Sequence, residues 1–166
     1  MSIKPQELTL EGFRPYGHFV ALNNLPPNTV IIGGGKVKFH PDLLELDTGG
    51  ANPTFSTCVV EWRDGVVDVS EIHECGELIL PLNGDILIHV GSPTLKDKPP
   101  LDHIEIFRVP KLTAVVLHPG VWHHAPFALG ELPVITLIGL PRRTYHNDCT
   151  VVELSESEHI RFIPAE

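Results

Sequence analysis

The strongest constraint on the fold is a series of short apolar runs rich in Val, Ile and Leu. Gly, Pro, Asn or Asp separates nearly all of these runs, and these residues favour turns over continued regular structure. Short strands that recur with turn chemistry between them are typical of an all-β sandwich or barrel. The predicted strands are 18–22, 29–32, 36–39, 57–62, 66–70, 78–82, 86–90, 104–109, 114–117, 121–125 and 134–140.

Two dipeptides predict tight hairpins. Asp-Gly at 64–65 and Asn-Gly at 83–84 both favour the positive φ angles of a type I′ turn. The second turn would pair strand 78–82 with strand 86–90, and both faces of that hairpin would then be apolar. A sheet with one face in water alternates apolar and polar residues, so another sheet, a helix or a second subunit must cover the hairpin. Because predicted helix is scarce, we expect a homo-oligomer, and specifically a homodimer.

Length and charge restrict the class of protein. The chain has 166 residues, enough for a hydrophobic core, and we expect a single domain spanning residues 1–166. The formal net charge is −9, whereas a nucleic-acid binder needs clustered Lys and Arg. We therefore expect a small-molecule substrate and no nucleic-acid partner.

Cysteine usage and hydropathy indicate the compartment. The three cysteines are odd in number, widely spaced and without a paired motif, which is typical of reduced thiols in the cytosol. No apolar run approaches the length of a membrane span, and the first residues do not resemble a secretion signal. We expect a cytoplasmic protein without a membrane partner.

Candidate chemical residues fall in two segments. Glu71, His73 and Glu77 lie close together, and His123 follows some forty residues later. A bend near residues 75–76 would place Glu71 and His73 on one strand and Glu77 on the next. Such a mixed nitrogen and oxygen set suits a divalent cation such as Mn, Fe, Ni or Zn. It equally suits general acid–base chemistry without a metal.

Each candidate also has a structural explanation. His73 and His123 could be hydrogen-bonded core residues, and His118 could satisfy backbone groups of the adjoining turn. Glu71 and Glu77 could be solvated carboxylates at the ends of strands.

The spacing of these residues resembles the two cupin motifs. His73-x₃-Glu77-x₆-Gly84 resembles the second half of the first motif, and residues 118–123 resemble the second, Pro-x-Gly-x-x-His. Glu71 stands where the first motif has its first His. The resemblance implies a cupin-like double-stranded β-helix, or jelly-roll barrel, with minor short helices. It also implies that His73, Glu77 and His123 could bind a metal if Glu71 substitutes as a ligand.

Within the cupins, the chain more closely resembles the ureidoglycolate lyase family. The matching segments are 11–17, 32–35 with 38–40, Glu71-x-His73, 147–149 and, most specifically, Val121-Trp122-His123-His124 followed by Pro126. The family has an Asn-Asn pair where this chain has Gly-Gly in its triple-glycine segment. The family also has an Asp-Arg pair where this chain has residues 140–143.

The resemblance implies a C–N lyase that cleaves ureidoglycolate to glyoxylate and urea, a step of allantoin and purine-nitrogen catabolism. This reaction needs a base for the hydroxyl proton and an acid for the departing nitrogen, roles that His73, Glu77 and His123 could fill. Binding of the substrate, including its carboxylate, is assigned to Lys38, Arg63, Trp122 and His118.

Two alternatives remain open at the level of the sequence. One is a diverged cupin that binds a small carboxylate or a sugar-like ligand without this chemistry. The other is a metal-dependent cupin enzyme that acts on another substrate.

Overall fold

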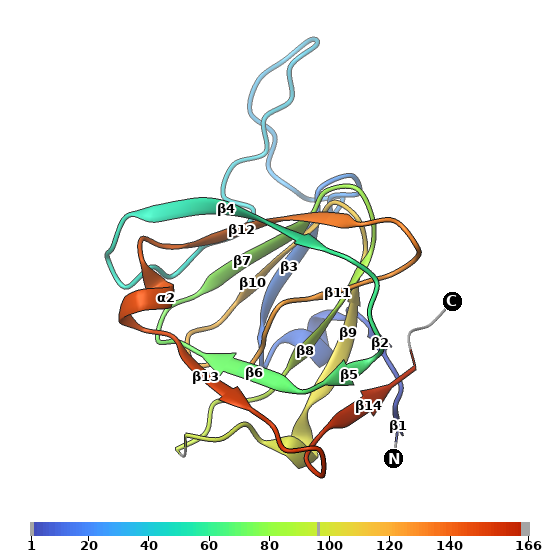
Figure 1. Cartoon of the computed structure of the whole chain (residues 1–166). Coiled ribbons are helices and arrows are strands. Elements are labelled where there is room, and N and C mark those ends of the chain that lie inside the picture. Colours follow the sequence, from blue (N-terminus) through green and yellow to red (C-terminus); the bar gives the residue numbers. More distant parts are fainter. Residues whose placement is uncertain (1, 96, 164–166) are drawn as a thin grey trace.

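The computed structural model describes residues 2–95 and 97–163, and this part of the chain is mostly β-structure with short helices (Figure 1). The all-β prediction is confirmed. The single-domain prediction for residues 1–166 also covers residues 1, 96 and 164–166, which lie outside the described residues.

The helices are short: α1 (Leu10–Phe13), the 3₁₀ helix η1 (Leu101–His103) and α2 (Thr144–Asn147). The strands are β1 (Ser2–Ile3), β2 (Gln6–Glu7), β3 (Gly17–Ala21), β4 (Pro53–Val60), β5 (Val66–Val67), β6 (Val69–Ile72), β7 (Glu77–Pro81), β8 (Ile86–Val90), β9 (Glu105–Val109), β10 (Thr113–Leu117), β11 (Phe127–Ala128), β12 (Val134–Pro141), β13 (Thr150–Glu153) and β14 (Ile160–Phe162).

Two larger sheets form the barrel. One has the strand order β3-β10-β7-β12-β4 and the other β11-β8-β9-β2. The chain passes from one sheet to the other between β7 and β8, between β9 and β10, and again on either side of β11. This alternation is the double-stranded β-helix of the cupin fold (Figure 1). The pairs β13-β6 and β14-β5 extend the second layer.

Apolar side chains from both sheets fill the barrel. The main core includes Phe13, Ile79, Ile88, Val115 and Leu117, all almost fully buried. A second cluster lies on the other face of β8, beneath β5 and β14. Strand β8 is therefore apolar on both faces because each face packs against a different core.

Both hairpin predictions are wrong. Strand β7 pairs with β10 and β12, whereas β8 pairs with β9 and β11, so residues 83–84 connect two sheets. Neither Gly65 nor Gly84 has the positive φ that a type I′ turn requires. Instead, Asn83 donates to the Pro133 carbonyl and accepts the Ile135 N–H, which ties the corner to β12.

The apolar faces of β7 and β8 are therefore covered in a different way from the one expected for a hairpin. Those strands belong to facing sheets, so most of the apolar surface attributed to a hairpin is buried inside one chain. The homodimer stays a prediction. In the described chain, no helix combines the length and apolar character needed to cross a membrane.

Residues 24–41 form an arm that extends away from the barrel (Figure 1). The predicted strands 29–32 and 36–39 reduce to one isolated bridge between Ile32 and Phe39 within this arm. The predicted strand 121–125 is likewise a loop, held by bridges from Trp122 to Gly91 and from His123 to Glu71. Each bridge in these two segments joins a single residue pair, so neither segment forms a ladder.

Candidate active site

Three segments bring His73, Glu77 and His123 together inside the barrel. His73 follows β6, Glu77 begins β7, and His123 lies in the loop between β10 and β11. Their exposed fractions are only 4%, 6% and 2%. We call these residues the inner trio.

Local backbone structure explains the placement. The chain bends at residues 75–76, as the spacing suggested, and the Gly76 N–H donates to the Asp47 carbonyl over 2.7 Å. A Cβ on Gly76 would lie 3.1 Å from the carbonyl oxygens of Asp47 and Leu117, so a larger residue would crowd this bend. The loop carrying His123 is fixed by mutual backbone hydrogen bonds with Glu71.

Both imidazoles of the inner trio point at one carboxylate oxygen. The Nε2 atom of His73 lies 3.0 Å from Glu77 Oε2, and Nε2 of His123 lies 2.9 Å from the same atom. The two rings are nearly perpendicular, with centroids 4.9 Å apart. Three potential ligand atoms therefore converge on one small volume.

Backbone carbonyls decide the tautomers. Nδ1 of His73 lies 2.8 Å from the Cys75 carbonyl, and Nδ1 of His123 lies 2.8 Å from the Val121 carbonyl. A carbonyl can only accept, so each Nδ1 carries the proton. In the neutral form each Nε2 then presents a lone pair to Glu77. Such a cluster needs a cation, either an added proton on an imidazole or a metal ion.

Charge in the metal-free trio follows from this arrangement. Burial opposes ionisation of Glu77, but the charge of His123 and hydrogen bonds from both imidazoles outweigh it and lower the pKa to about 2. Burial likewise opposes protonation of His123, yet the charge and hydrogen bond of Glu77 raise its pKa. The metal-free site thus pairs an ionised carboxylate with a histidine whose protonated form that carboxylate favours.

The donor set also fits a divalent metal ion. The ligand atoms of His73, Glu77 and His123 lie within 4.8 Å of one another. Two imidazoles whose Nδ1–H groups are fixed by carbonyls are the usual presentation of metal-binding histidines. Donors at about 2.1 Å from a metal and at right angles to each other are separated by about 3.0 Å, close to the observed spacing.

Glu71 and His124 lie at the more open edge of the trio. Glu71 Oε1 is 3.9 Å from Nε2 of His123, and its Oε2 is 4.0 Å from Nε2 of His124. The side chains of Glu71 and His124 are 13% and 29% exposed, against 3% for His123, so they mark the side of the site that faces solvent. Glu71 is therefore close enough to complete a ligand set or to exchange protons with a substrate.

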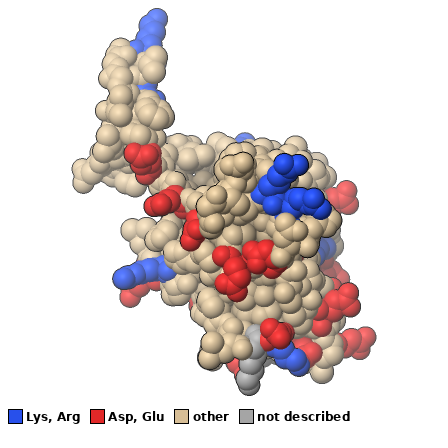
Figure 2. Space-filling model, turned by 90° about the vertical axis from the view of Figure 1, so that its left-hand side faces the viewer, with Lys and Arg blue, Asp and Glu red and all other residues tan. Residues whose placement is uncertain are grey.

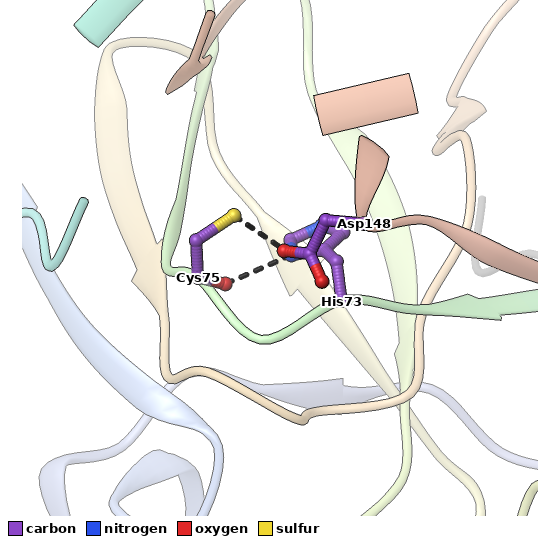
Figure 3. A group of neighbouring side chains, drawn as sticks. All are labelled: His73, Cys75 and Asp148. Atoms are coloured by element: carbon purple, nitrogen blue, oxygen red, sulfur yellow. Dashed lines mark hydrogen bonds between the residues drawn. The ribbon is translucent and has the colours of Figure 1, made fainter. Parts of the chain in front are cut away.

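A second cluster, His73, Cys75 and Asp148, shares His73 with the inner trio (Figure 3). The Cys75 thiol contacts Asp148, and its sulfur lies 3.4 Å from Nδ1 of His73. Burial raises the pKa of this thiol to about 11. Because Nδ1 of His73 already donates to Cys75, this cluster orients His73 rather than forming a separate metal centre.

Helix α2 and the residues after it add Tyr145, which the sequence did not indicate, and Cys149, which belongs to the segment 147–149 that resembles the family. Burial, followed by the negative charges of Glu77 and Glu71, raises the pKa of Tyr145 to about 12. The Cys149 thiol donates to Glu71 Oε2 over 3.5 Å. A helix of this length has no hydrophobic periodicity, so no sequence signal could place Tyr145 at the site.

Two of the predicted substrate-binding cations do not face the trio. An Nη2 atom of Arg63 donates to the Ala125 carbonyl over 2.8 Å, and its guanidinium stacks 3.9 Å from the centroid of the Phe127 ring. Lys38 is exposed on the arm. Within the described residues, no lysine or arginine lies within ion-pairing distance of Glu71 or Glu77.

The other two predicted substrate-binding residues also point elsewhere. The His118 ring packs edge-on against His18, with centroids 4.8 Å apart. Trp122 is fully buried, and its indole N–H donates to Thr94 Oγ1 over 3.0 Å. All four assignments remain predictions, and this arrangement of the chain brings none of the four against the inner trio.

Comparison with known proteins identifies the family of this chain. The family model for ureidoglycolate lyase matches residues 1–161. The chain belongs to the ureidoglycolate lyase family. No match was found among curated proteins.

Solved structures similar to this ureidoglycolate lyase family member are distant in sequence. A dTDP sugar isomerase from Desulfovibrio desulfuricans G20 has 15% identity and a TM-score of 0.49, with 87% of this chain and 89% of that chain covered. Oxalate decarboxylase from Bacillus subtilis has 15% identity and a TM-score of 0.45, with 65% of this chain covered. The match spans only 26% of the decarboxylase chain.

Proposed function

We propose that this protein is a C–N lyase that cleaves ureidoglycolate to glyoxylate and urea. Membership of the ureidoglycolate lyase family supports the substrate. The observation that carries the proposal is the convergence of two Nε2 atoms on one Glu77 oxygen inside the barrel. This arrangement provides groups for two proton transfers at adjacent positions, which the reaction requires.

Ureidoglycolate is a carbinolamide, so its cleavage needs no water and no redox partner. A base removes the hydroxyl proton, the C–O bond becomes the carbonyl of glyoxylate, and the C–N bond breaks. An acid protonates the departing nitrogen, which completes urea. The proton removed and the proton supplied balance.

Without a metal, the inner trio handles both protons. His123, whose pKa Glu77 raises, holds the proton for the departing nitrogen. Glu77, whose pKa is about 2, stays ionised and keeps the imidazolium in place. His73 serves as the base in the state in which its Nε2 carries no proton and Glu77 accepts a hydrogen bond only from His123, while Nδ1 of His73 stays committed to the Cys75 carbonyl.

With a divalent metal ion such as Mn, Fe, Ni or Zn, the inner trio would hold the ion and Glu71 would lie at its edge. The ion would supply positive charge for the substrate carboxylate and for the developing oxyanion. His73 and His123 would be neutral ligands, so the proton transfers would fall to Glu71, His124 and Tyr145 on the open side.

The wider setting is part of the same proposal. We place the reaction in allantoin and purine-nitrogen catabolism in the cytoplasm, and we expect the chain to act as a homodimer. Reduced cysteines support the compartment, since all three are free in the described structure.

One experiment tests the function and the site together. Metal content is measured on the purified protein, and urea and glyoxylate release from ureidoglycolate is followed with and without a chelator. We expect equal amounts of the two products from the wild-type chain and none from His73→Ala or His123→Ala. His103→Ala is the matched control, since His103 is exposed in η1 and has no assigned role at the site. Absence of turnover with every metal tested would exclude the lyase, whereas turnover that survives both substitutions would exclude the site.

A further inference from the structure

Two histidines lie side by side on the outer face of the five-stranded sheet. His18 lies opposite Val116 in the β3-β10 pair, and His118 comes two residues after Val116 in the chain. The two histidines are therefore diagonal cross-strand neighbours on one face of the sheet. That face is the outer one, because Val115 and Leu117 point into the main core on the opposite side.

The two rings have nearly the same mutual geometry as the imidazoles of the inner trio. The centroids of His18 and His118 are 4.8 Å apart and their planes form an angle of 88°. For His73 and His123 the values are 4.9 Å and 85°, and those two rings approach one atom. Within the described residues, neither outer ring makes a hydrogen bond, so its nitrogens are available to a ligand. Because His18 is exposed and His118 half-buried, rotation of either ring costs little.

A cavity of about 510 Å³ joins this pair to two carboxylates. His18 and His118 line it together with Glu45 and Asp47. Oδ1 of Asp47 already accepts the Gly49 N–H over 2.9 Å. Glu45 is exposed and also lines the adjoining cavity with His18, and it makes no ion pair in the described part of the chain. Glu45 is therefore the carboxylate better placed to share a ligand with the two rings.

The surroundings favour a cation as that ligand. Asp42, Glu45 and Asp47 directly follow the arm, in a chain of net charge −9. Figure 2 shows acidic side chains where the arm meets the body. Arg14 lines the adjoining cavity but not this one. Carboxylates around a cavity raise the local concentration of cations, and two imidazoles with one carboxylate are a donor set typical of zinc.

The same segment supports the backbone of the inner trio. The Asp47 carbonyl accepts the Gly76 N–H over 2.7 Å, in the bend between His73 and Glu77. A Cβ on Gly76 would lie 3.1 Å from that carbonyl oxygen, so the two backbones are in close contact. An ion held by Glu45 would anchor this segment to β3 and β10 two residues before Asp47, and would thereby restrain the bend.

We propose that His18, His118 and Glu45 form a second divalent metal site, suited to zinc, on the outer face of the sheet. An ion at this site braces the segment that holds the bend of the inner trio. The exposed ligands let the ion leave on dialysis, unlike an ion held by the buried inner trio. The proposal goes beyond the proposed function and does not depend on it, since its tests need no ureidoglycolate.

Calorimetric titration of dialysed protein with zinc chloride tests the site. In His123→Ala, where the inner trio has lost a ligand, we expect one zinc ion to bind. Adding His18→Ala or His118→Ala should weaken binding by at least about tenfold. Adding the exposed His103→Ala is the matched control and should leave it unchanged. Should His123→Ala fail to fold, the wild-type chain must bind one zinc ion more than His18→Ala. Zinc binding that survives both outer substitutions, or its absence from the parent protein, would overturn the site.

Two further measurements identify the ligands. The imidazole C–H resonances of His18 and His118, assigned from the single variants, should shift together in NMR spectra as zinc is added. Glu45→Gln should weaken binding by at least about tenfold, whereas Asp47→Asn should not. Loss of affinity from Asp47→Asn with no loss from Glu45→Gln would overturn the role of Glu45.

Amide hydrogen exchange tests the bracing. In the His123→Ala protein, zinc should slow exchange of the Gly76 N–H, because local opening of the bend becomes less favourable. With His18→Ala added, zinc should have no such effect. Unchanged exchange at Gly76 in protein that binds zinc would overturn the bracing.

Discussion

Nε2 of His123 lies 2.9 Å from Glu77 Oε2, although 46 positions separate the two residues in the chain. The contact is shared, because Nε2 of His73 approaches the same oxygen from another strand. One buried carboxylate therefore organises both imidazoles, and the predictions on catalysis and metal binding follow from its charge.

Glu77→Gln keeps the size of the side chain and removes its charge. We expect the rate of urea release to fall about 100-fold or more, the usual loss when a positioned acid–base group is removed. In metal-free protein the pKa of His123 should also fall, because burial would no longer be opposed by the carboxylate. Steady-state kinetics and NMR titration of the imidazole measure the two effects. The exposed Glu74→Gln should show neither, and an unchanged His123 titration would contradict the pairing.

Metal binding should depend on the whole inner trio. If the trio holds the ion, elemental analysis should find about one divalent metal ion per chain, lost from both His73→Ala and His123→Ala. Affinity should decrease as pH falls, because a protonated imidazole cannot be a ligand. His103→Ala should retain the metal. Retention of the metal by His123→Ala would mean that the ion binds elsewhere.

Tyr145→Phe removes a phenol that stays protonated at neutral pH, since its pKa is about 12. If the hydroxyl donates to the substrate, KM should rise by roughly tenfold while stability is unchanged, because Tyr145 is 59% exposed. Progress curves at several substrate concentrations give KM and kcat separately. Wild-type values for both would remove Tyr145 from the site.

Gly17→Ala should destabilise the barrel strongly. A Cβ at this position would lie 2.1 Å from the Val116 carbonyl oxygen on the neighbouring strand, and backbone cannot yield cheaply. We expect a loss of about 3 kcal/mol and a melting temperature lower by about 10 °C. Gly34→Ala, with open space around its Cβ and no positive φ, is the matched control. Equal melting temperatures for the two variants would contradict the packing.

Asp85→Asn tests an ion pair far from the site. Burial raises the pKa of Asp85, but hydrogen bonds from the Lys111 N–H and from Arg108 outweigh it and lower the pKa. A lowered pKa contributes stability above the unfolded value near 3.8, and this contribution is lost as pH falls through the folded value. The variant should be less stable by about 1 kcal/mol at pH 7, and the difference should narrow below about pH 4. Urea unfolding at both pH values measures it; a constant difference would exclude the charge as its cause.

The barrel strands were predictable because their apolar runs and turn residues are local properties. Strands 18–22, 78–82, 86–90 and 134–140 were all recognisable in this way. The pairing of these strands was not predictable, since Asn-Gly at 83–84 has the composition of a hairpin turn but connects two sheets. There the contacts of Asn83 with β12 outweigh the local turn preference.

The sequence by itself determined the all-β class and the residue types of the candidate site, because strand periodicity and motif spacing are written along the chain. Only the tertiary structure decided that His73 and His123 share one Glu77 oxygen and that Glu71 lies between His123 and His124 at the open edge of the site. It also placed Arg63 on backbone carbonyls and Lys38 on a projecting arm. The reason is physical: residue types are carried by the chain, whereas distances between strands depend on which sheet each strand joins.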